Sequence, residues 1–169
     1  MFNKNRVIHK VVSSAPQWVQ KGLNVLPAPL TNAGLQFTLN QFFKPDLRAG
    51  RFSFLAAKTV HVVVADIGLA FYIALNPHHM RPELMVSNPG SQEADILFRG
   101  DMNDLLLLIT QRVDPDTLFF RRKLMLIGDT ELGLELKNLL DTIELHERLP
   151  KPLYQLSSEV AEEILLQRS

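Results

Sequence analysis

The central part of the chain, residues 51–100, alternates short β-branched and aromatic runs with turn-forming residues. Runs of this composition are typical of strands, and the Asp-Ile-Gly, Asn-Pro and Asn-Pro-Gly sequences between them favour tight turns. Tight turns join antiparallel strands, so the pattern predicts an antiparallel meander. The predicted strands are Thr59–Ala65, Leu69–Leu75, Glu83–Ser87 and Ala94–Arg99.

Helical periodicity precedes the predicted strands. Apolar residues recur at about 3.6-residue spacing within residues 35–43. This spacing predicts a helix that is capped by Thr31 or Asn32 and stops at Gly50, with Pro45 as a weak point inside it.

Aspartate residues mark the predicted starts of two helices that follow the strands. Asp101 lies ahead of a leucine run and is expected to cap a helix extending to about Arg112. Asp114 is followed by Pro115, and proline is favoured at the first helical position. This pair predicts a further helical turn that ends with Phe119 and Phe120.

A last strand and two helices complete the predicted domain. Residues 121–127 form the strand, which ends at Gly128, and Asp129 or Thr130 caps a leucine-striped helix. Residues 150–169 begin with two prolines and continue as an amphipathic helix. The order predicts an α+β fold: a single antiparallel sheet of about five strands, backed by helices, with an apolar tunnel between the layers.

The chain divides into three predicted parts: an amphipathic N-terminal extension (1–30), a lipid-binding domain (31–149) and a C-terminal amphipathic helix (150–169). Residues 1–45 contain five lysines and arginines and no acid. This charge pattern favours transient contact between the extension and an anionic membrane surface, although a solvated arm is the alternative. We expect the extension to be dispensable for folding.

The sequence offers little that resembles catalytic machinery. It has no cysteine, which excludes thiol catalysis and cysteine zinc sites, and it has no glycine-rich phosphate loop, GxSxG or HExxH motif. His78 and His79 fall in a predicted hairpin turn and are interpreted as exposed turn residues. We therefore expect a protein that is not an enzyme and that needs no metal or cofactor.

Charge and hydropathy restrict the remaining classes. The net charge of zero argues against a nucleic-acid partner. The longest apolar run, Ile67–Leu75, is roughly half of the ~20 residues that a membrane-spanning helix needs, and we see no signal peptide at the start. The sequence therefore predicts a cytoplasmic protein, with peripheral contact at the inner face of the membrane as a further expectation.

Apolar residues exceed the needs of a two-layer core, and together they predict a ligand tunnel, because ligand sites are concave and mostly apolar. Ordinary core packing is the alternative for each one taken singly. Leu136 and Leu140 are four residues apart and share a helix face. The predicted lining residues are Phe37, Phe42, Phe43, Leu105, Leu108, Phe119, Phe120, Leu132, Leu136, Leu139 and Leu140.

The segment 113–150, with its DPDTLFF and GDTELGL sequences, resembles the UbiT family of bacterial ubiquinone biosynthesis accessory factors, which carry a sterol carrier type 2 domain. Residues from about Thr31 to Ile143 fit the order of elements in that domain. The resemblance implies that the protein presents prenylated intermediates to hydroxylases of the UbiU and UbiV kind in oxygen-independent ubiquinone synthesis. It supplies no catalytic residue to carry over.

Arg121, Arg122 and Lys123 depart from the Gly-Lys pair that often precedes this strand in sterol carriers. They are interpreted either as a headgroup contact or as a solvated strand start. Two alternative functions remain open: an anionic phospholipid binder, for example one for phosphatidic acid, and a scaffold for ubiquinone-biosynthesis enzymes. The sequence is compatible with a monomer or a homodimer.

Overall fold

Five strands form one sheet in the order β3-β2-β1-β4-β5, which confirms the prediction of a single five-stranded sheet. The computed structural model describes residues 17–22, 25, 27–76, 82–90 and 93–168. His78 and His79 and most of the N-terminal extension lie outside the described residues. The strands are β1 (Thr59–Val64), β2 (Leu69–Asn76), β3 (Glu83–Ser87), β4 (Ile96–Gly100) and β5 (Leu124–Gly128).

The sheet is mixed, so the prediction that it is antiparallel throughout is wrong at one pair. Strands β1, β2 and β3 form the predicted meander, and β5 pairs antiparallel with β4. However, β4 runs parallel to β1, with Val60 opposite Ile96. Parallel neighbours need a long crossover connection, and here the β2–β3 hairpin lies between β1 and β4 along the chain and provides it.

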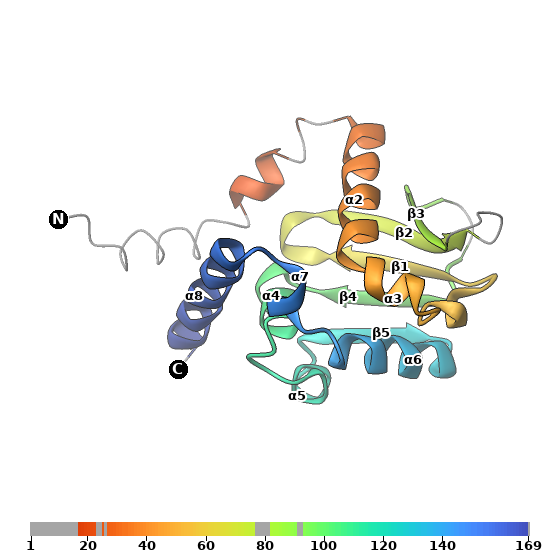
Figure 1. Cartoon of the computed structure of the whole chain (residues 1–169). Coiled ribbons are helices and arrows are strands. Elements are labelled where there is room, and N and C mark those ends of the chain that lie inside the picture. Colours follow the sequence, from red (N-terminus) through yellow and green to blue (C-terminus); the bar gives the residue numbers. More distant parts are fainter. Residues whose placement is uncertain (1–16, 23–24, 26, 77–81, 91–92, 169) are drawn as a thin grey trace.

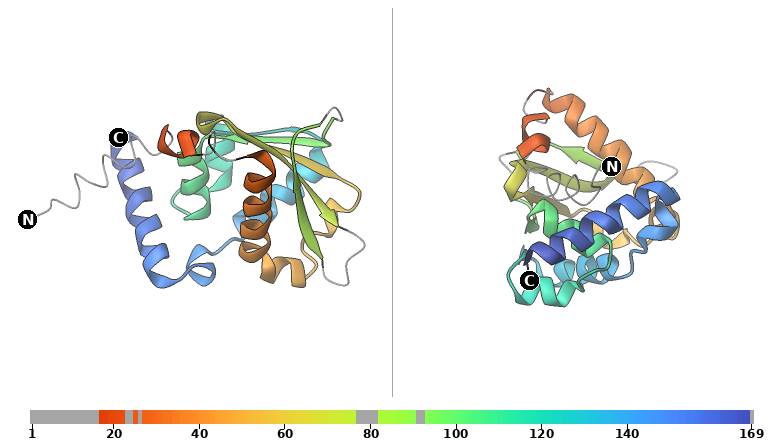
Figure 2. Two further views of the ribbon diagram at one scale, coloured as in Figure 1. Left: turned by 90° about the horizontal axis from the view of Figure 1, so that it is seen from above. Right: turned by 90° about the vertical axis from the view of Figure 1, so that its left-hand side faces the viewer.

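The helices α2, α3 and α6 cover one face of the sheet (Figures 1 and 2). In β1 the side chains of Val60, Val62 and Val64 are buried, whereas the alternating residues are only partly buried. The core therefore lies between this face and the helices. The helices are α2 (Ala28–Phe42), α3 (Lys44–Arg48), α4 (Met102–Ile109), α5 (Pro115–Phe120), α6 (Thr130–Asp141), α7 (Leu145–Arg148) and α8 (Lys151–Arg168), with 3-10 turns η1 (Ser53–Leu55) and η2 (Ala65–Ile67).

The first predicted helix starts earlier than expected and is divided. Pro27 is its N-cap residue, in place of Thr31 or Asn32, and Pro29 lies in the first turn, where proline is well tolerated. The helix is interrupted at Phe43, and Pro45 then lies in the first turn of α3. A proline inside a continuous helix would remove a backbone hydrogen bond and clash with the preceding turn, which explains the division.

Residues 121–123 form an exposed turn, and β5 begins only at Leu124, so the interpretation of these residues as a strand start is wrong. Arg122 has the left-handed backbone conformation, with φ of 56°. Its N–H donates to the carbonyl oxygen of Phe119 at 3.0 Å, which ends α5 with a closed turn.

A buried ion cluster joins α7 to the junction between α2 and α3. Asp46 is only 2% exposed. Its carboxylate accepts from Arg148 Nη1 at 2.5 Å and from Arg51 Nη1 at 2.7 Å. The Arg148 guanidinium also lies 5.2 Å from the centre of the Phe42 ring and donates to the Phe42 carbonyl oxygen. The sequence analysis gave no indication of this cluster.

The C-terminal helix α8 packs against α4 at one end of the molecule (Figure 1). Leu107 of α4 is buried together with Ala161 and Ile164 of α8. Arg168 Nη1 also pairs with the buried Asp104 at 2.5 Å. Within the described ranges, no helix combines the length and the apolar character needed to cross a bilayer.

Candidate lipid-binding site

An open groove of about 580 Å³ lies between α5, the edge strand β5 and α6. All five residues of β5 line it, together with Ile96 of the neighbouring strand. Phe119 contributes from α5, and Gly133 and Leu134 contribute from α6. The volume lies within the range of about 300–1,000 Å³ that is usual for small-molecule sites, and most of the lining is apolar.

The groove has its shape because α6 crosses close to the sheet at a glycine. A Cβ atom added at Gly133 would lie 3.1 Å from Ile96 Cδ1. Leu132, on the core side of α6, is buried, whereas Leu134 is 55% exposed at the rim of the groove. The helix is thus anchored on one side and leaves the β5 side of the groove open.

Charged side chains lie at the rim of the groove. Lys137 Nζ of α6 pairs with Asp116 Oδ1 of α5 at 2.5 Å, so this ion pair connects the two helical walls. Arg122 also lines the groove from the turn that follows α5. An apolar floor beside rim cations suits a ligand with an apolar chain and a polar or anionic end.

A cluster around Asp129 fixes the start of α6 against the sheet. The Asp129 carboxylate accepts from the N–H groups of Glu131 and Leu132 at 3.0 and 3.1 Å, which confirms it as the helix cap. Lys58 Nζ lies 3.0 Å from Asp129 and 3.3 Å from Asp95. The hydrogen bond from Leu132, followed by that from Lys58, lowers the pKa of Asp129, and the Asp129 hydrogen bond raises the pKa of Lys58.

Asp114 caps α5 as predicted. Its carboxylate accepts from the Thr117 hydroxyl at 2.6 Å and from the Thr117 N–H at 2.8 Å, and these bonds lower the pKa of Asp114. Asp101 precedes α4 as predicted but forms no side-chain cap. Instead, Asp66 Oδ1 accepts from the Met102 N–H at 2.9 Å.

The tunnel and its lining stay a prediction, and in the part of the chain that the structure describes the predicted lining residues lie in different environments. Phe119 is the one that lines the groove. The side chains of Phe37 and Phe120 are 67% and 90% exposed. Core positions are occupied by Leu108, Leu132 and Leu139, and partly buried positions by Phe42, Phe43, Leu105, Leu136 and Leu140.

Sequence reasoning missed the β5 side chains, Gly133 and Leu134 as groove residues. The missing information was the order of strands, because a groove beside β5 exists only if β5 is an edge strand. Of the three predicted headgroup cations, Arg122 lines the groove, whereas Arg121 and Lys123 are exposed in the same turn.

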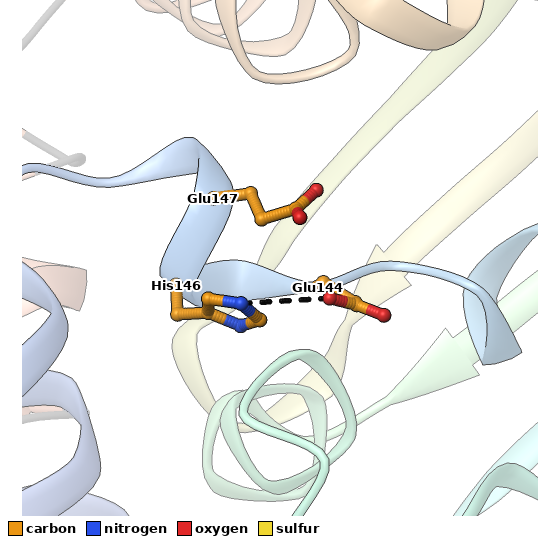
Figure 3. Close-up of side chains that lie close together, drawn as sticks. All are labelled: Glu144, His146 and Glu147. Atoms are coloured by element: carbon orange, nitrogen blue, oxygen red, sulfur yellow. Dashed lines mark ion pairs between the residues drawn. The ribbon is translucent and has the colours of Figure 1, made fainter.

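Glu144, His146 and Glu147 lie together on the surface at α7 (Figure 3). One potential ligand atom from each lies within 4.8 Å of the others, and His146 Nε2 is 3.5 Å from Glu144 Oε2. All three residues are exposed and lie within four positions of one short helical turn and its N-cap. We interpret them as a solvated ion pair with a neighbouring carboxylate and assign them no metal.

The chain matches the SCP-2 sterol transfer family over residues 38–141, a range that contains all of α5, β5 and α6. It is also 35% identical to the ubiquinone biosynthesis accessory factor UbiT of Escherichia coli K12, over 90% of this chain and 84% of that protein. The chain belongs to the UbiT family, within the SCP-2 sterol transfer family. The resemblance found in segment 113–150 is thereby confirmed.

A further relative agrees with this family membership, and a solved structure agrees with the fold. UbiT of Escherichia coli O157:H7 shows the same 35% identity over 153 residues. A solved structure described as a UbiJ-SCP2 ubiquinone synthesis protein superposes with a TM-score of 0.53 at 23% identity, over 69% of this chain and 97% of that one. This likeness concerns the fold, and it places the mixed sheet and its helices among sterol-carrier-like domains.

Proposed function

We propose that this protein is a lipid-binding accessory factor of ubiquinone biosynthesis. In this proposal the groove between α5, β5 and α6 holds the apolar chain of a prenylated intermediate. The observation that carries the proposal is the predominantly apolar lining of this groove, within the range that matches the SCP-2 family. The membership of the UbiT family supports the pathway.

The groove suits a ligand that is held and then released. Burying about ten methylene equivalents contributes roughly 8 kcal/mol, which corresponds to a dissociation constant near the micromolar range. The apolar chain lies on the floor formed by Leu124 and Leu126, and the ring of the intermediate reaches the rim at Arg122 and Lys137. Membership of the UbiT family supports the further proposal that the bound intermediate is presented to hydroxylases of the UbiU and UbiV kind.

An anionic phospholipid, such as phosphatidic acid, is the second candidate ligand. It is favoured by the rim cation Arg122, because a guanidinium group binds phosphate through charge-assisted hydrogen bonds, whereas Lys137 is already paired with Asp116. Its acyl chains would occupy the same floor. Extraction of the purified protein with organic solvent, followed by lipid mass spectrometry, separates prenylated phenols from phospholipid.

We predict that Leu134→Asp lowers the amount of lipid that co-purifies with the protein. Covering the exposed half of a leucine contributes about 1 kcal/mol. The new carboxylate must also lose hydration beside an apolar chain. Lipid affinity should therefore fall about tenfold or more. The measurement is lipid per protein, by quantitative mass spectrometry, for wild type and variant purified in parallel.

Leu156→Asp is the matched control. Leu156 is 53% exposed, against 55% for Leu134, and it lies on α8, away from the groove. The control should keep wild-type lipid content. Equal losses in both variants, or no loss in Leu134→Asp, would mean that the groove does not hold the lipid.

A further inference from the structure

Phe120, the last residue of α5, is 90% exposed. Leu118, two residues earlier, is buried in the core, so α5 is anchored while its C-terminal aromatic ring projects into solvent. Covering such a ring with another surface would remove apolar area from water, which is favourable. Three exposed cations, Arg121, Arg122 and Lys123, follow directly.

The stretch from Thr117 to Gly128 contains these three cations and no acid. Among the described residues, none of the three side chains has a recorded ion pair, although Lys137 of the facing helix pairs with Asp116. The turn therefore presents unneutralised positive charge beside an exposed aromatic ring. This combination is typical of surfaces that contact anionic membranes.

The backbone of this turn is in a conformation that glycine would adopt more easily. Arg122 occupies the left-handed position after α5, and the N–H of Lys123 donates to the Leu118 carbonyl oxygen at 2.9 Å. Helix ends of this kind usually carry glycine at this position. An arginine here is tolerated at a conformational cost, which points to a use for its side chain.

The turn lies at the mouth of the groove. Arg122 itself lines the groove, and so do the exposed side chains of Met125, Ile127 and Leu134. The cations, the aromatic ring and the apolar rim therefore belong to the same part of the molecule. A flat anionic surface that contacts the turn would also face the open side of the groove.

We propose that residues 120–123, which we call the docking turn, bind the surface of an anionic phospholipid bilayer and so place the groove mouth against the membrane. Phe120 enters the interface while the three cations contact lipid phosphates. This proposal rests on the proposed function only for the purpose of docking, which is to load the groove with lipid from the bilayer. Docking itself is measured independently of lipid in the groove.

The test is co-sedimentation of the full chain with vesicles made of equal parts phosphatidylcholine and phosphatidylglycerol. The variant Arg121→Gln/Arg122→Gln/Lys123→Gln should bind about 100-fold more weakly, because each of these cations contributes roughly a fivefold attraction near an anionic surface. Wild-type binding should fall as salt is raised. Phe120→Ser should weaken binding as well, and it should leave the salt dependence in place.

The matched control, Lys44→Gln/Arg48→Gln/Lys151→Gln, removes the same charge from exposed positions outside the docking turn. Phe37→Ser is the control for the aromatic ring. Both controls should bind vesicles nearly as wild type does. If both triple variants lose vesicle binding equally, the binding depends on net charge. If the wild-type protein binds vesicles of pure phosphatidylcholine equally well, the binding depends on apolar contact alone. Either result overturns the proposal, as does wild-type binding by the docking-turn triple variant.

A second measurement separates docking from groove binding. A fluorescent fatty acid is titrated into each protein without vesicles, and its emission reports occupancy of the groove. Phe120→Ser and Arg121→Gln/Lys123→Gln, which leave Arg122 of the groove in place, should bind this probe within a few-fold of wild type, which also shows that they are folded. Loss of probe binding in Leu134→Asp but not in Phe120→Ser is expected. Failure of the wild type to bind the probe would count against the proposed function, whereas loss of vesicle binding alone concerns the docking turn.

Discussion

Replacing Gly128 by alanine is expected to destabilise the protein by roughly 3 kcal/mol or more. Gly128 ends β5 with φ of +131°, which residues with a side chain rarely adopt. A Cβ atom there would lie 2.3 Å from the Asp95 carbonyl oxygen and 3.0 Å from Ile96 Cα. Backbone strain of about 1–3 kcal/mol and a similar overpacking term act together, because the clashing atoms belong to the backbone and cannot rotate away.

The measurement is urea unfolding of Gly128→Ala beside Gly34→Ala. Gly34 lies in α2, and a Cβ atom there has no neighbour within 4 Å. Alanine at that position should stabilise the protein by about 0.5–1 kcal/mol, since it removes the entropic cost of a helical glycine. Opposite signs for the two variants are expected, and a wild-type midpoint for Gly128→Ala would refute the assigned role of this residue.

Asp46→Ala is expected to lower the free energy of unfolding by about 3–5 kcal/mol, because removal of one partner leaves buried charge uncompensated. The side chain of Arg148 is only 9% accessible and cannot move into water without leaving Phe42. The loss should also release α7 from α3, and this should appear as faster amide hydrogen exchange in residues 145–148.

Glu162→Ala is the control for the buried cluster. Glu162 pairs with Arg112 at 2.7 Å, but its side chain is 60% accessible and that of Arg112 is 36% accessible. Exposed pairs of this kind contribute about 0–1 kcal/mol. A similar small change in Asp46→Ala would mean that the Asp46 cluster contributes little to the fold.

Local chemistry explains which parts of the fold were predictable. The three strand segments within residues 59–87 and the caps at Asp114 and Asp129 are determined by residues close together in the sequence. Both predictions agree with the structure. The parallel pairing of β4 with β1 depends on which strands become neighbours after the chain has crossed the sheet. No spacing within the sequence specifies that choice.

The same reason limits prediction of the site. Phe119 was predicted because it follows a recognisable cap, and it lies in the groove. Leu136 and Leu140 were predicted from helical spacing, which identifies an apolar face but not the element that covers it. In the structure these two residues pack against the core, whereas Leu134, on a different face of the helix, lines the groove.

The most direct test of the central claim is photo-crosslinking with a prenylated phenol that carries a diazirine on its isoprenoid chain, mapped by peptide mass spectrometry. The account predicts labels within residues 119–137, on Phe119, the β5 side chains and Leu134, and competition by the unlabelled prenylated phenol. Labels concentrated on α2, α3 or α8, with none in residues 119–137, would contradict the claim that the groove between α5, β5 and α6 holds the lipid chain.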